Sequence, residues 1–369
     1  MKKILFGITS LTLGGAERVL VDLANKLCNE YEITIFTIYA KGELEKQLDK
    51  RIKLEHLYNV SYLELPNFKR KIIMPLKTLL FKKLIYNKKI RKDYNVEIAF
   101  LEGPITRILS CKNIDVKKVV WVHNDITKVF GRGIKAKIKK SIDKKVYKKY
   151  NKIIFVSKDN QKKFEEIYNL DNEKEVIYNY IDDERVLEKA NEKIDTKFNK
   201  DELNIITVAR LVEQKAIDRL VKIHSKLIND GLKHNFYVIG DGPEKEKIEN
   251  TIKKYNVENS FKLLGKKENP YPYIKKADCF ALLSYYEGYP MVLLEAQILN
   301  KYIIITDTAA RETLQDYKKC MVLNNDEIAI YIGLSKLLRN KDKCIIENTD
   351  MDKYSNDDII DKIKEVIEI

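Results

Sequence analysis

The chain has 369 residues, of which 44% are hydrophobic, and Lys and Arg outnumber Asp and Glu by 69 to 55. This length exceeds what one hydrophobic core usually organises, so we expect two domains. The formal net charge of +14 favours an acidic partner, which leaves nucleic acid, anionic lipid and phosphorylated substrates open. The five cysteines are scattered and form no C-x-x-C pair, which argues against a disulfide framework or a zinc site and fits a reducing cytoplasm.

Short apolar runs alternate with helical patterns along the chain, as is typical of βαβ units and a parallel sheet. The run at residues 4–8 follows Met-Lys-Lys, but Thr9-Ser10 ends it, so we interpret it as a first strand and not as a signal peptide. No run approaches the roughly 18 apolar residues that span a bilayer, so any membrane contact should be peripheral. The predicted strands are 4–8, 33–38, 96–101, 119–122, 153–156 and 176–178, then 205–208, 237–239, 261–264, 279–283 and 303–305.

Between these two series, residues 182–200 are highly charged and contain few large apolar side chains, the composition of a connector. The sequence therefore predicts an α/β protein with two consecutive doubly wound, Rossmann-like parallel-sheet domains. We place the N-terminal, acceptor-binding domain at residues 1–181 and the C-terminal, donor-binding domain at residues 203–349. Residues 350–369 should form a helix that packs back on the N-terminal domain.

The most informative motif follows the predicted strand 279–283 and runs Ser284-Tyr-Tyr-Glu287-Gly288-Tyr-Pro290-Met-Val-Leu-Leu-Glu295-Ala296. Pro290 suits the first turn of a helix, where its missing N–H costs nothing. The free N–H groups that follow would face a phosphate at the positive end of the helix dipole; they belong to Met291, Val292 and Leu293. Glu287 and Glu295 flank that end and can accept hydrogen bonds from sugar hydroxyls. The alternative is a helix cap with a solvated glutamate.

A second motif, Ala209-Arg210-Leu211-Val212-Glu213-Gln214-Lys215, follows the first predicted strand of the second domain. Ligands of open α/β sheets bind at the carboxyl ends of the strands, and both motifs lie there. Arg210 can hold a phosphate bidentately and Lys215 can add a point charge. Two surface charges are the alternative for this motif alone.

These motifs, in this order, resemble glycosyltransferase family 4, whose members are retaining enzymes of the GT-B fold with two Rossmann-like domains facing each other across a central cleft. The matching residues are Gly14-Gly15-Ala16-Glu17-Arg18, Ala209-Arg210-Leu211 with Gln214-Lys215, Gly240-Asp241-Gly242-Pro243-Glu244, and Glu287-Gly288-x-Pro290 with Glu295-Ala296. Trp121–Asp125 and Asn269–Ile274 are further similar to members that build bacterial capsule and other cell-surface polysaccharides. Ala216 and Asn300 depart from the family, which often has glycine at these positions.

The resemblance implies roles for these residues. Arg210 and Lys215 would hold the donor diphosphate, Glu295 the ribose hydroxyls, and Glu287 would face the transferred sugar. Gly14 and Gly15 would let their loop approach the donor phosphates, and His123 resembles the family's active-site histidine. A hydrogen-bonded core residue is the alternative for His123. The implied reaction moves a hexose-type sugar from a nucleotide sugar, with UDP the expected nucleotide, to a polyprenyl-linked or cell-surface glycan acceptor.

We expect no metal or other cofactor. Asp350-Met351-Asp352 has the spelling of the Asp-x-Asp motif of metal-dependent glycosyltransferases, but it lies in a polar tail with no preceding strand. Arg210, Lys215 and the helix after Pro290 would supply the positive charge instead.

Two basic segments lie in the predicted acceptor-binding domain. Residues 68–92 contain ten Lys or Arg interleaved with apolar residues, and residues 132–149 contain nine. For the first segment we predict docking on anionic lipid, which would place a cytoplasmic enzyme at the inner face of the cell membrane, near a polyprenyl-diphosphate-linked acceptor. For the second segment, docking on lipid and a helix packed on the sheet are equally favoured. Nucleic acid is not an expected partner, because no recognition motif accompanies the charge.

Three other functions compete with glycosyl transfer. A nicotinamide-dependent oxidoreductase would need G-x-G-x-x-G and an acidic residue about twenty positions on, and Gly14-Gly15 lacks both. A UDP-sugar epimerase of the same fold would share the donor site but bind no acceptor. A non-catalytic lipid-binding protein would explain the charge but not the paired carboxylates.

Overall fold

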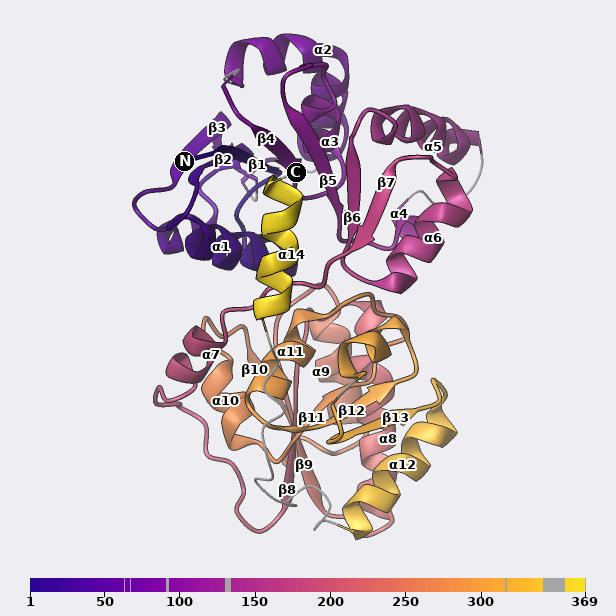
Figure 1. Cartoon of the computed structure of the whole chain (residues 1–369). Helices are drawn as coiled ribbons and strands as arrows, with labels where there is room; N and C mark the ends of the chain where they lie inside the picture. The colour runs from indigo at the N-terminus through magenta and orange to yellow at the C-terminus, as the bar shows by residue number, and fades with distance from the viewer. Residues whose placement is uncertain are drawn as a thin grey trace. The chain divides into compact units, whose positions relative to one another are not determined.

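A computed structural model describes residues 1–62, 64–66, 68–90, 93–129, 134–315, 317–340 and 356–368. Asp350-Met351-Asp352 lies outside these residues. The chain divides into two compact units, in each of which strands and helices alternate along the chain (Figure 1). Unit 1 comprises Met1–Ile181 with Ser355–Ile369, and unit 2 comprises Asp182–Tyr354.

Unit 1 is built on a parallel sheet whose described strands run in the order β3-β2-β1-β4-β5-β6-β7. These strands are β1 (Lys3–Ile8), β2 (Glu32–Ala40), β3 (Lys53–Ser61), β4 (Val96–Ala99), β5 (Lys117–Val122), β6 (Lys152–Phe155) and β7 (Glu173–Val176). The helices are α1 (Gly15–Leu27), η1 (Glu43–Gln47), η2 (Lys69–Ile73), α2 (Met74–Lys89), α3 (Pro104–Leu109), α4 (Ile126–Val129), α5 (Ile134–Tyr147), α6 (Lys158–Tyr168) and α14 (Asp357–Glu368).

Unit 2 repeats this plan with a parallel sheet in the order β10-β9-β8-β11-β12-β13. Its described strands are β8 (Leu203–Val208), β9 (His234–Ile239), β10 (Phe261–Gly265), β11 (Cys279–Leu282), β12 (Tyr302–Thr306) and β13 (Cys320–Leu323). The helices are α7 (Asp183–Lys189), η3 (Glu213–Lys215), α8 (Ile217–Asn229), α9 (Lys245–Lys254), α10 (Tyr271–Lys276), α11 (Met291–Ile298), η4 (Ala309–Leu314) and α12 (Glu327–Arg339).

The prediction of two doubly wound parallel sheets is confirmed. The central strands carry unbroken runs of buried apolar residues, because helices cover both faces of such a sheet. The sequence pattern missed the edge strands β3 and β13, whose residues are mostly half-buried or exposed. An edge strand packs fewer neighbours, so its sequence carries a weaker apolar signal.

Each sheet has a point at which the strand order reverses, and this point marks the ligand-binding edge of a doubly wound sheet. In unit 1 it lies between β1 and β4, and in unit 2 it lies between β8 and β11. The predicted motifs follow these strands. Gly14-Gly15 come after β1, Arg210 and Lys215 after β8, and Glu287 with Pro290 after β11.

The charged stretch that we expected to be a connector contains helix α7. The Asp182 side chain caps this helix by accepting a hydrogen bond from the Arg185 amide at 3.0 Å. Helix α7 contacts α10 and α11 within unit 2. Its one fully buried side chain is Val186, which explains why the composition gave no sign of a packed element.

Helix α14 packs against unit 1, although it comes last in the chain (Figure 1). Its apolar face is buried and comprises Ile359, Ile360, Ile363, Val366 and Ile367. At its end, Glu368 forms an ion pair with Lys2 at 2.8 Å and accepts a hydrogen bond from Tyr31 at 2.9 Å. Lys117 also donates to the Val366 carbonyl at 3.0 Å.

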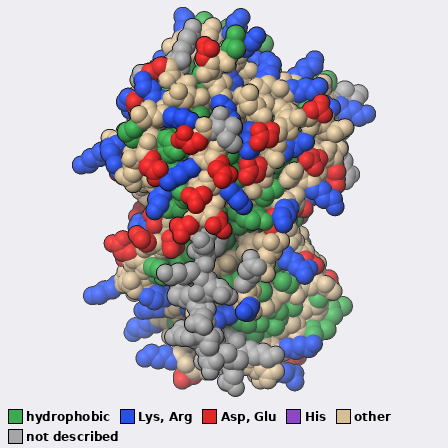
Figure 2. All heavy atoms as spheres, in the orientation of Figure 1, with side chains coloured by type: hydrophobic (Ala, Val, Ile, Leu, Met, Phe, Trp, Pro, Cys, Tyr) green, Lys and Arg blue, Asp and Glu red, His purple; other side chains and the backbone are tan. Residues whose placement is uncertain are grey.

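Helix α2 and the turn before it carry an exposed apolar stripe, which we define as Phe68, Ile72, Leu76, Leu80 and Leu84. These residues recur every fourth position, and each is between 51% and 67% exposed. The opposite side of α2 is fixed by Tyr86, whose hydroxyl donates to Glu97, and Glu97 in turn pairs with the buried Lys118. Figure 2 shows apolar side chains among Lys and Arg at the end of unit 1 where α2 lies.

Among the helices that the structure describes, none combines the length and the apolar composition required to cross a membrane.

Ala216 and Asn300 both adopt left-handed backbone conformations, with φ of 52° and 53°. These are the two positions where the resembled family often has glycine, so the backbone explains the family's preference. Asparagine tolerates this region better than other non-glycine residues, whereas alanine pays a steric cost of about 1–2 kcal/mol.

We therefore expect Ala216→Gly to raise the free energy of unfolding by about 1 kcal/mol, since relief of the steric clash exceeds the entropy that glycine adds to the unfolded chain. Asn300→Gly is the matched control and should change stability less. Urea unfolding of both variants measures the difference. Equal or opposite effects would contradict this account.

Candidate functional site

In unit 2, a pair of glycines fixes the backbone that carries Arg210. Gly240 has a φ of 149°, and a Cβ on it would lie 1.8 Å from the Ala209 carbonyl oxygen. A Cβ on Gly242 would lie 2.3 Å from the Leu211 carbonyl oxygen. These residues therefore let the loop after β9 pack directly on the loop after β8. Arg210 itself is exposed at the carboxyl edge of the sheet, where it can reach a ligand.

The loops after β8 and β11 are joined by three polar contacts. Lys215 Nζ lies 2.6 Å from Glu287 Oε1, and the two side chains are only 16% and 6% exposed. Gln214 Nε2 donates to the Tyr286 carbonyl at 2.9 Å, and the Tyr285 amide donates to the Gln214 carbonyl at 2.9 Å. The two motifs predicted from distant parts of the sequence thus form one structure at the reversal point of the sheet.

Arg219 on α8 holds the loop that follows β11 in place. Its guanidinium is buried, donates to the Leu283 carbonyl at 2.7 Å and lies 4.3 Å from the centre of the Tyr285 ring. Asn325 ties the same segment by donating to the Tyr285 carbonyl at 2.7 Å. Sequence reasoning missed Arg219, because a basic residue within an amphipathic helix pattern gives no sign of burial.

Pro290 occupies the N-cap position before α11 and not its first turn, which corrects the sequence-based expectation. The Leu293 amide donates to the Pro290 carbonyl at 3.1 Å, so it is not one of the groups available to an anion. The geometry of a helix start leaves the amides of Met291 and Val292 without an intrahelical acceptor. Two amides, at the positive end of the helix dipole, are therefore placed to bind a phosphate.

Glu295 lies further along α11 and meets a tyrosine of α10. Tyr271 Oη is 3.3 Å from Glu295 Oε1, and Arg185 Nη1 of helix α7 is 3.1 Å from Tyr271 Oη. The Arg185 guanidinium lies 5.7 Å from the centre of the Tyr271 ring. The sequence singled out Glu295 but gave no indication that Arg185 contacts the tyrosine bound to it.

In unit 1, Gly14 and Gly15 lie at the start of α1, directly after the loop that follows β1. Both are exposed. Gly14 has a φ of −152°, which any residue can adopt, and the atoms nearest to an added Cβ belong to the movable carboxylate of Glu17. The backbone therefore does not demand glycine at position 14, in contrast to Gly240.

His123 follows β5 and packs against Phe100, with 4.8 Å between the ring centres. Burial lowers the pKa of its imidazole to about 3, so the ring is neutral at physiological pH. Its Nε2 atom is buried and has no hydrogen-bond partner within the described residues. An unpaired buried polar atom costs about 1–3 kcal/mol, which favours a functional role over that of a hydrogen-bonded core histidine.

Glu102, which sequence reasoning missed, holds the loop that contains His123. Its two carboxylate oxygens accept hydrogen bonds from the Asn124 amide and side chain, both at 2.8 Å. Burial raises the pKa of Glu102, while these hydrogen bonds oppose the rise. Asn160 on α6 fixes the same loop by donating to the His123 carbonyl at 3.2 Å. A carboxylate three residues after a buried strand was a signal available in the sequence.

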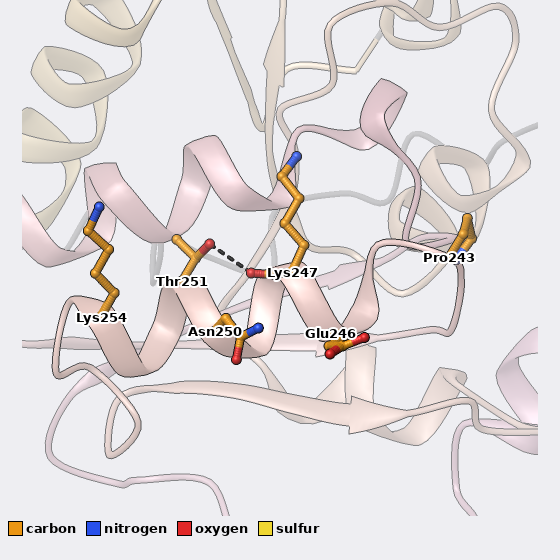
Figure 3. Close-up of a pocket in the computed structure, with 6 residues that line it drawn as sticks. All are labelled: Pro243, Glu246, Lys247, Asn250, Thr251 and Lys254. Atoms are coloured by element: carbon orange, nitrogen blue, oxygen red, sulfur yellow. Dashed lines mark hydrogen bonds between the residues drawn. The ribbon is translucent and has the colours of Figure 1, made fainter.

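The described residues contain no cluster of three or more His, Cys, Asp or Glu side chains able to hold a metal ion. An open hollow of about 480 Å³ lies along α9, as Figure 3 shows. It is lined by Pro243, Glu246, Lys247, Asn250, Thr251 and Lys254. None of the predicted site residues lines it, and its walls are solvated side chains of a single helix and its preceding turn, so we assign it no role.

Comparison with known protein families identifies the class of the protein. Residues 13–185 match the family model described as "Glycosyltransferase Family 4", and residues 188–358 match that of "Glycosyl transferases group 1". The protein is a glycosyltransferase of the GT-B fold. More specifically, the chain belongs to glycosyltransferase family 4.

Relatives with a similar sequence include two bacterial glycosyltransferases. One is the N-acetylgalactosamine-N,N'-diacetylbacillosaminyl-diphospho-undecaprenol 4-alpha-N-acetylgalactosaminyltransferase of Campylobacter jejuni, which is 28% identical over 352 residues, covering 92% of this chain and 91% of the relative. Another is the amylovoran biosynthesis glycosyltransferase AmsD of Erwinia amylovora, 24% identical over 300 residues, covering 80% and 78%. Among solved structures, Anabaena HepE in complex with UDP and glucose superimposes with a TM-score of 0.72 at 16% identity, with 100% of both chains covered.

Proposed function

We propose that the protein is a retaining glycosyltransferase that moves a hexose-type sugar from a UDP-sugar to a polyprenyl-diphosphate-linked glycan. The observation that carries the proposal is the joined pair of loops in unit 2, where Lys215, Glu287 and the start of α11 meet at the reversal point of the sheet. The relatives support it, since one is named for an undecaprenol-linked acceptor and a solved structure of the same fold holds UDP. Family membership favours transfer over the epimerase and lipid-binding alternatives.

The chemistry of this site suits a leaving diphosphate. Negative charge grows on the β-phosphate as the glycosidic bond breaks, so cations aimed there stabilise the transition state more than the ground state. Arg210 is exposed and can bind the diphosphate bidentately. The Lys215 ammonium has three donors, of which Glu287 takes one, so the others can reach phosphate oxygens. We infer that positive charge from these groups and α11 replaces a metal ion.

Arg210→Ala gives the cleanest test of this function, because Arg210 is exposed and its loss should leave the fold intact. Turnover should fall about 100-fold, as removal of a preorganised charge contact usually does. Release of UDP from a panel of UDP-sugars measures it. Lys253→Ala is the matched control, because Lys253 is an exposed lysine near the C-terminal end of α9, and this variant should keep normal turnover. Near-normal turnover of Arg210→Ala would place the donor site elsewhere.

The partner residues need a different design, since Lys215 and Glu287 form a mostly buried pair. Removing either one leaves the other charge unpaired, so each single variant mixes stability with catalysis. Lys215→Ala, Glu287→Gln and the double variant should therefore be compared as a cycle, with melting temperature and turnover measured together. Turnover should remain low in the double variant even where stability recovers.

We expect the product to keep the anomeric configuration of the donor. In this proposal an acceptor hydroxyl attacks the sugar on the face of the leaving diphosphate, while the buried Glu287 faces the developing positive charge. His123, neutral and with its Nε2 unpaired, would donate or accept a hydrogen bond at the sugar. The anomeric coupling in the NMR spectrum of the product measures the outcome, and inversion would refute the retaining mechanism.

The exposed stripe of α2 suits peripheral docking on an anionic membrane. Five apolar side chains line one side of the helix, and Lys69, Lys77, Lys83, Lys88 and Lys89 are exposed around them. Insertion of the apolar residues and attraction of the lysines to anionic lipid would act together. Such docking would hold a cytoplasmic enzyme at the inner face of the cell membrane, where a polyprenyl-linked acceptor is anchored. Lys82 is only half-exposed, and burial lowers its pKa, so it is not part of this surface.

Reversing Lys83, Lys88 and Lys89 to Glu should weaken liposome binding by about 100-fold, because each lysine near an anionic surface contributes about 1 kcal/mol. Added salt should weaken binding of the native protein in the same way. Sedimentation with phosphatidylglycerol vesicles measures both effects. The matched control reverses three exposed lysines of unit 2, Lys253, Lys254 and Lys262, and should bind normally. Equal loss in both variants would show that only net charge matters.

A further inference from the structure

We infer that Tyr271 and Arg185 are positioning residues that orient the Glu295 carboxylate for the ribose of the donor nucleotide. This inference rests on the proposed function and on the role that the family resemblance implies for Glu295, which is to bind the ribose hydroxyls of the donor. It assigns a role to Tyr271, which lies within the motif Asn269–Ile274, and to Arg185, which no motif indicated and which lies on the helix α7 that follows the boundary between the units.

The hydrogen bonds that link Arg185, Tyr271 and Glu295 can run in only one direction. A guanidinium has donors but no acceptor, so Arg185 Nη1 donates to Tyr271 Oη across 3.1 Å. The hydroxyl proton is then directed at the carboxylate, and Tyr271 Oη donates to Glu295 Oε1 across 3.3 Å. An ionised carboxylate only accepts, which fixes the same order from the other end. The Tyr271 hydroxyl thus links the Arg185 guanidinium to the Glu295 carboxylate.

The surroundings make this arrangement rigid. Tyr271 is 5% exposed and begins α10, and its amide donates a hydrogen bond to Asn269 Oδ1 at 3.1 Å. Asn269 also donates to the carbonyl of Lys189 at the end of α7, at 2.8 Å, so α10 and α7 are tied together. With Oε1 bound to the tyrosine, the Glu295 carboxylate cannot rotate freely about its last side-chain bond. A fixed carboxylate can discriminate hydroxyls of a ribose, whereas a rotating one binds them less selectively.

Tyr271→Phe tests the inference, because it removes the hydroxyl and keeps the buried ring. We expect UDP to bind about tenfold more weakly, while 2′,3′-dideoxy-UDP, which lacks both ribose hydroxyls, should bind almost as it does to the native protein. The ratio of the dissociation constant of 2′,3′-dideoxy-UDP to that of UDP, measured by calorimetry, should therefore fall. A merely structural role would weaken both nucleotides equally and lower the melting temperature. For the full reaction, the donor KM should rise with little change in kcat.

Tyr273→Phe is the matched control on the same helix. Tyr273 is 6% exposed and its hydroxyl donates to Asp195 at 2.7 Å, away from Glu295, so its loss should leave the ratio unchanged. Arg185→Met keeps the aliphatic part of the side chain and should lower the ratio less than Tyr271→Phe.

Glu295→Gln distinguishes failure of the proposed donor site from failure of the positioning role. If Glu295→Gln leaves the ratio unchanged, Glu295 does not bind the ribose and the proposed donor site is wrong. If Glu295→Gln lowers the ratio but Tyr271→Phe does not, the donor site stands and the positioning role is refuted. Tyr271→Phe in the Glu295→Gln background should have a smaller effect than in the native protein, because the two residues act together.

Discussion

The ion pair between Lys215 and Glu287 is the contact on which the proposed site depends. It joins two loops that leave adjacent strands of one parallel sheet but lie 72 positions apart in the sequence. Both partners are largely screened from water, so neither charge is tolerable without the other. The backbone bonds of Gln214 and the buried Arg219 then hold the loops in the register that this pair requires. In the proposed site, the charge that acts in catalysis and the local stability would thus be carried by the same atoms.

Parallel sheets were the most predictable feature of the protein, because buried strands such as β1 and β12 leave continuous apolar runs in the sequence. The motif residues were predictable for the same reason, since they stand directly after those runs. Helix α7 was not, as it buries one side chain fully and its charges resemble a connector. The status of Pro290 and Leu293 also required coordinates, because the start of a helix shifts by one residue without changing the sequence pattern.

Glycines in family motifs serve unlike purposes here. Gly240 and Gly242 are required by the close approach of two loops, and Ala216 adopts a left-handed backbone conformation although it is not glycine. At Gly14, neither a close approach of two loops nor a left-handed backbone conformation requires glycine. A glycine that the protein's own backbone does not need is the one most consistent with close approach of something outside the chain. The fold therefore identifies Gly240 and Gly242 as structural glycines, a distinction that the sequence alone could not make.

Helix α14 gives unit 1 an unusual dependence on the far end of the chain. Ile363 and Val366 are each 1% exposed, and they complete the apolar packing of a unit whose other residues end at Ile181. Unit 2 is consequently an insertion within unit 1 in topological terms. A fragment cut at the boundary would expose the surface that α14 covers, whereas unit 2 is continuous in sequence. If unit 2 binds the donor, as proposed, exchange of donor specificity between such enzymes would therefore replace an internal segment and keep both flanking parts from one parent.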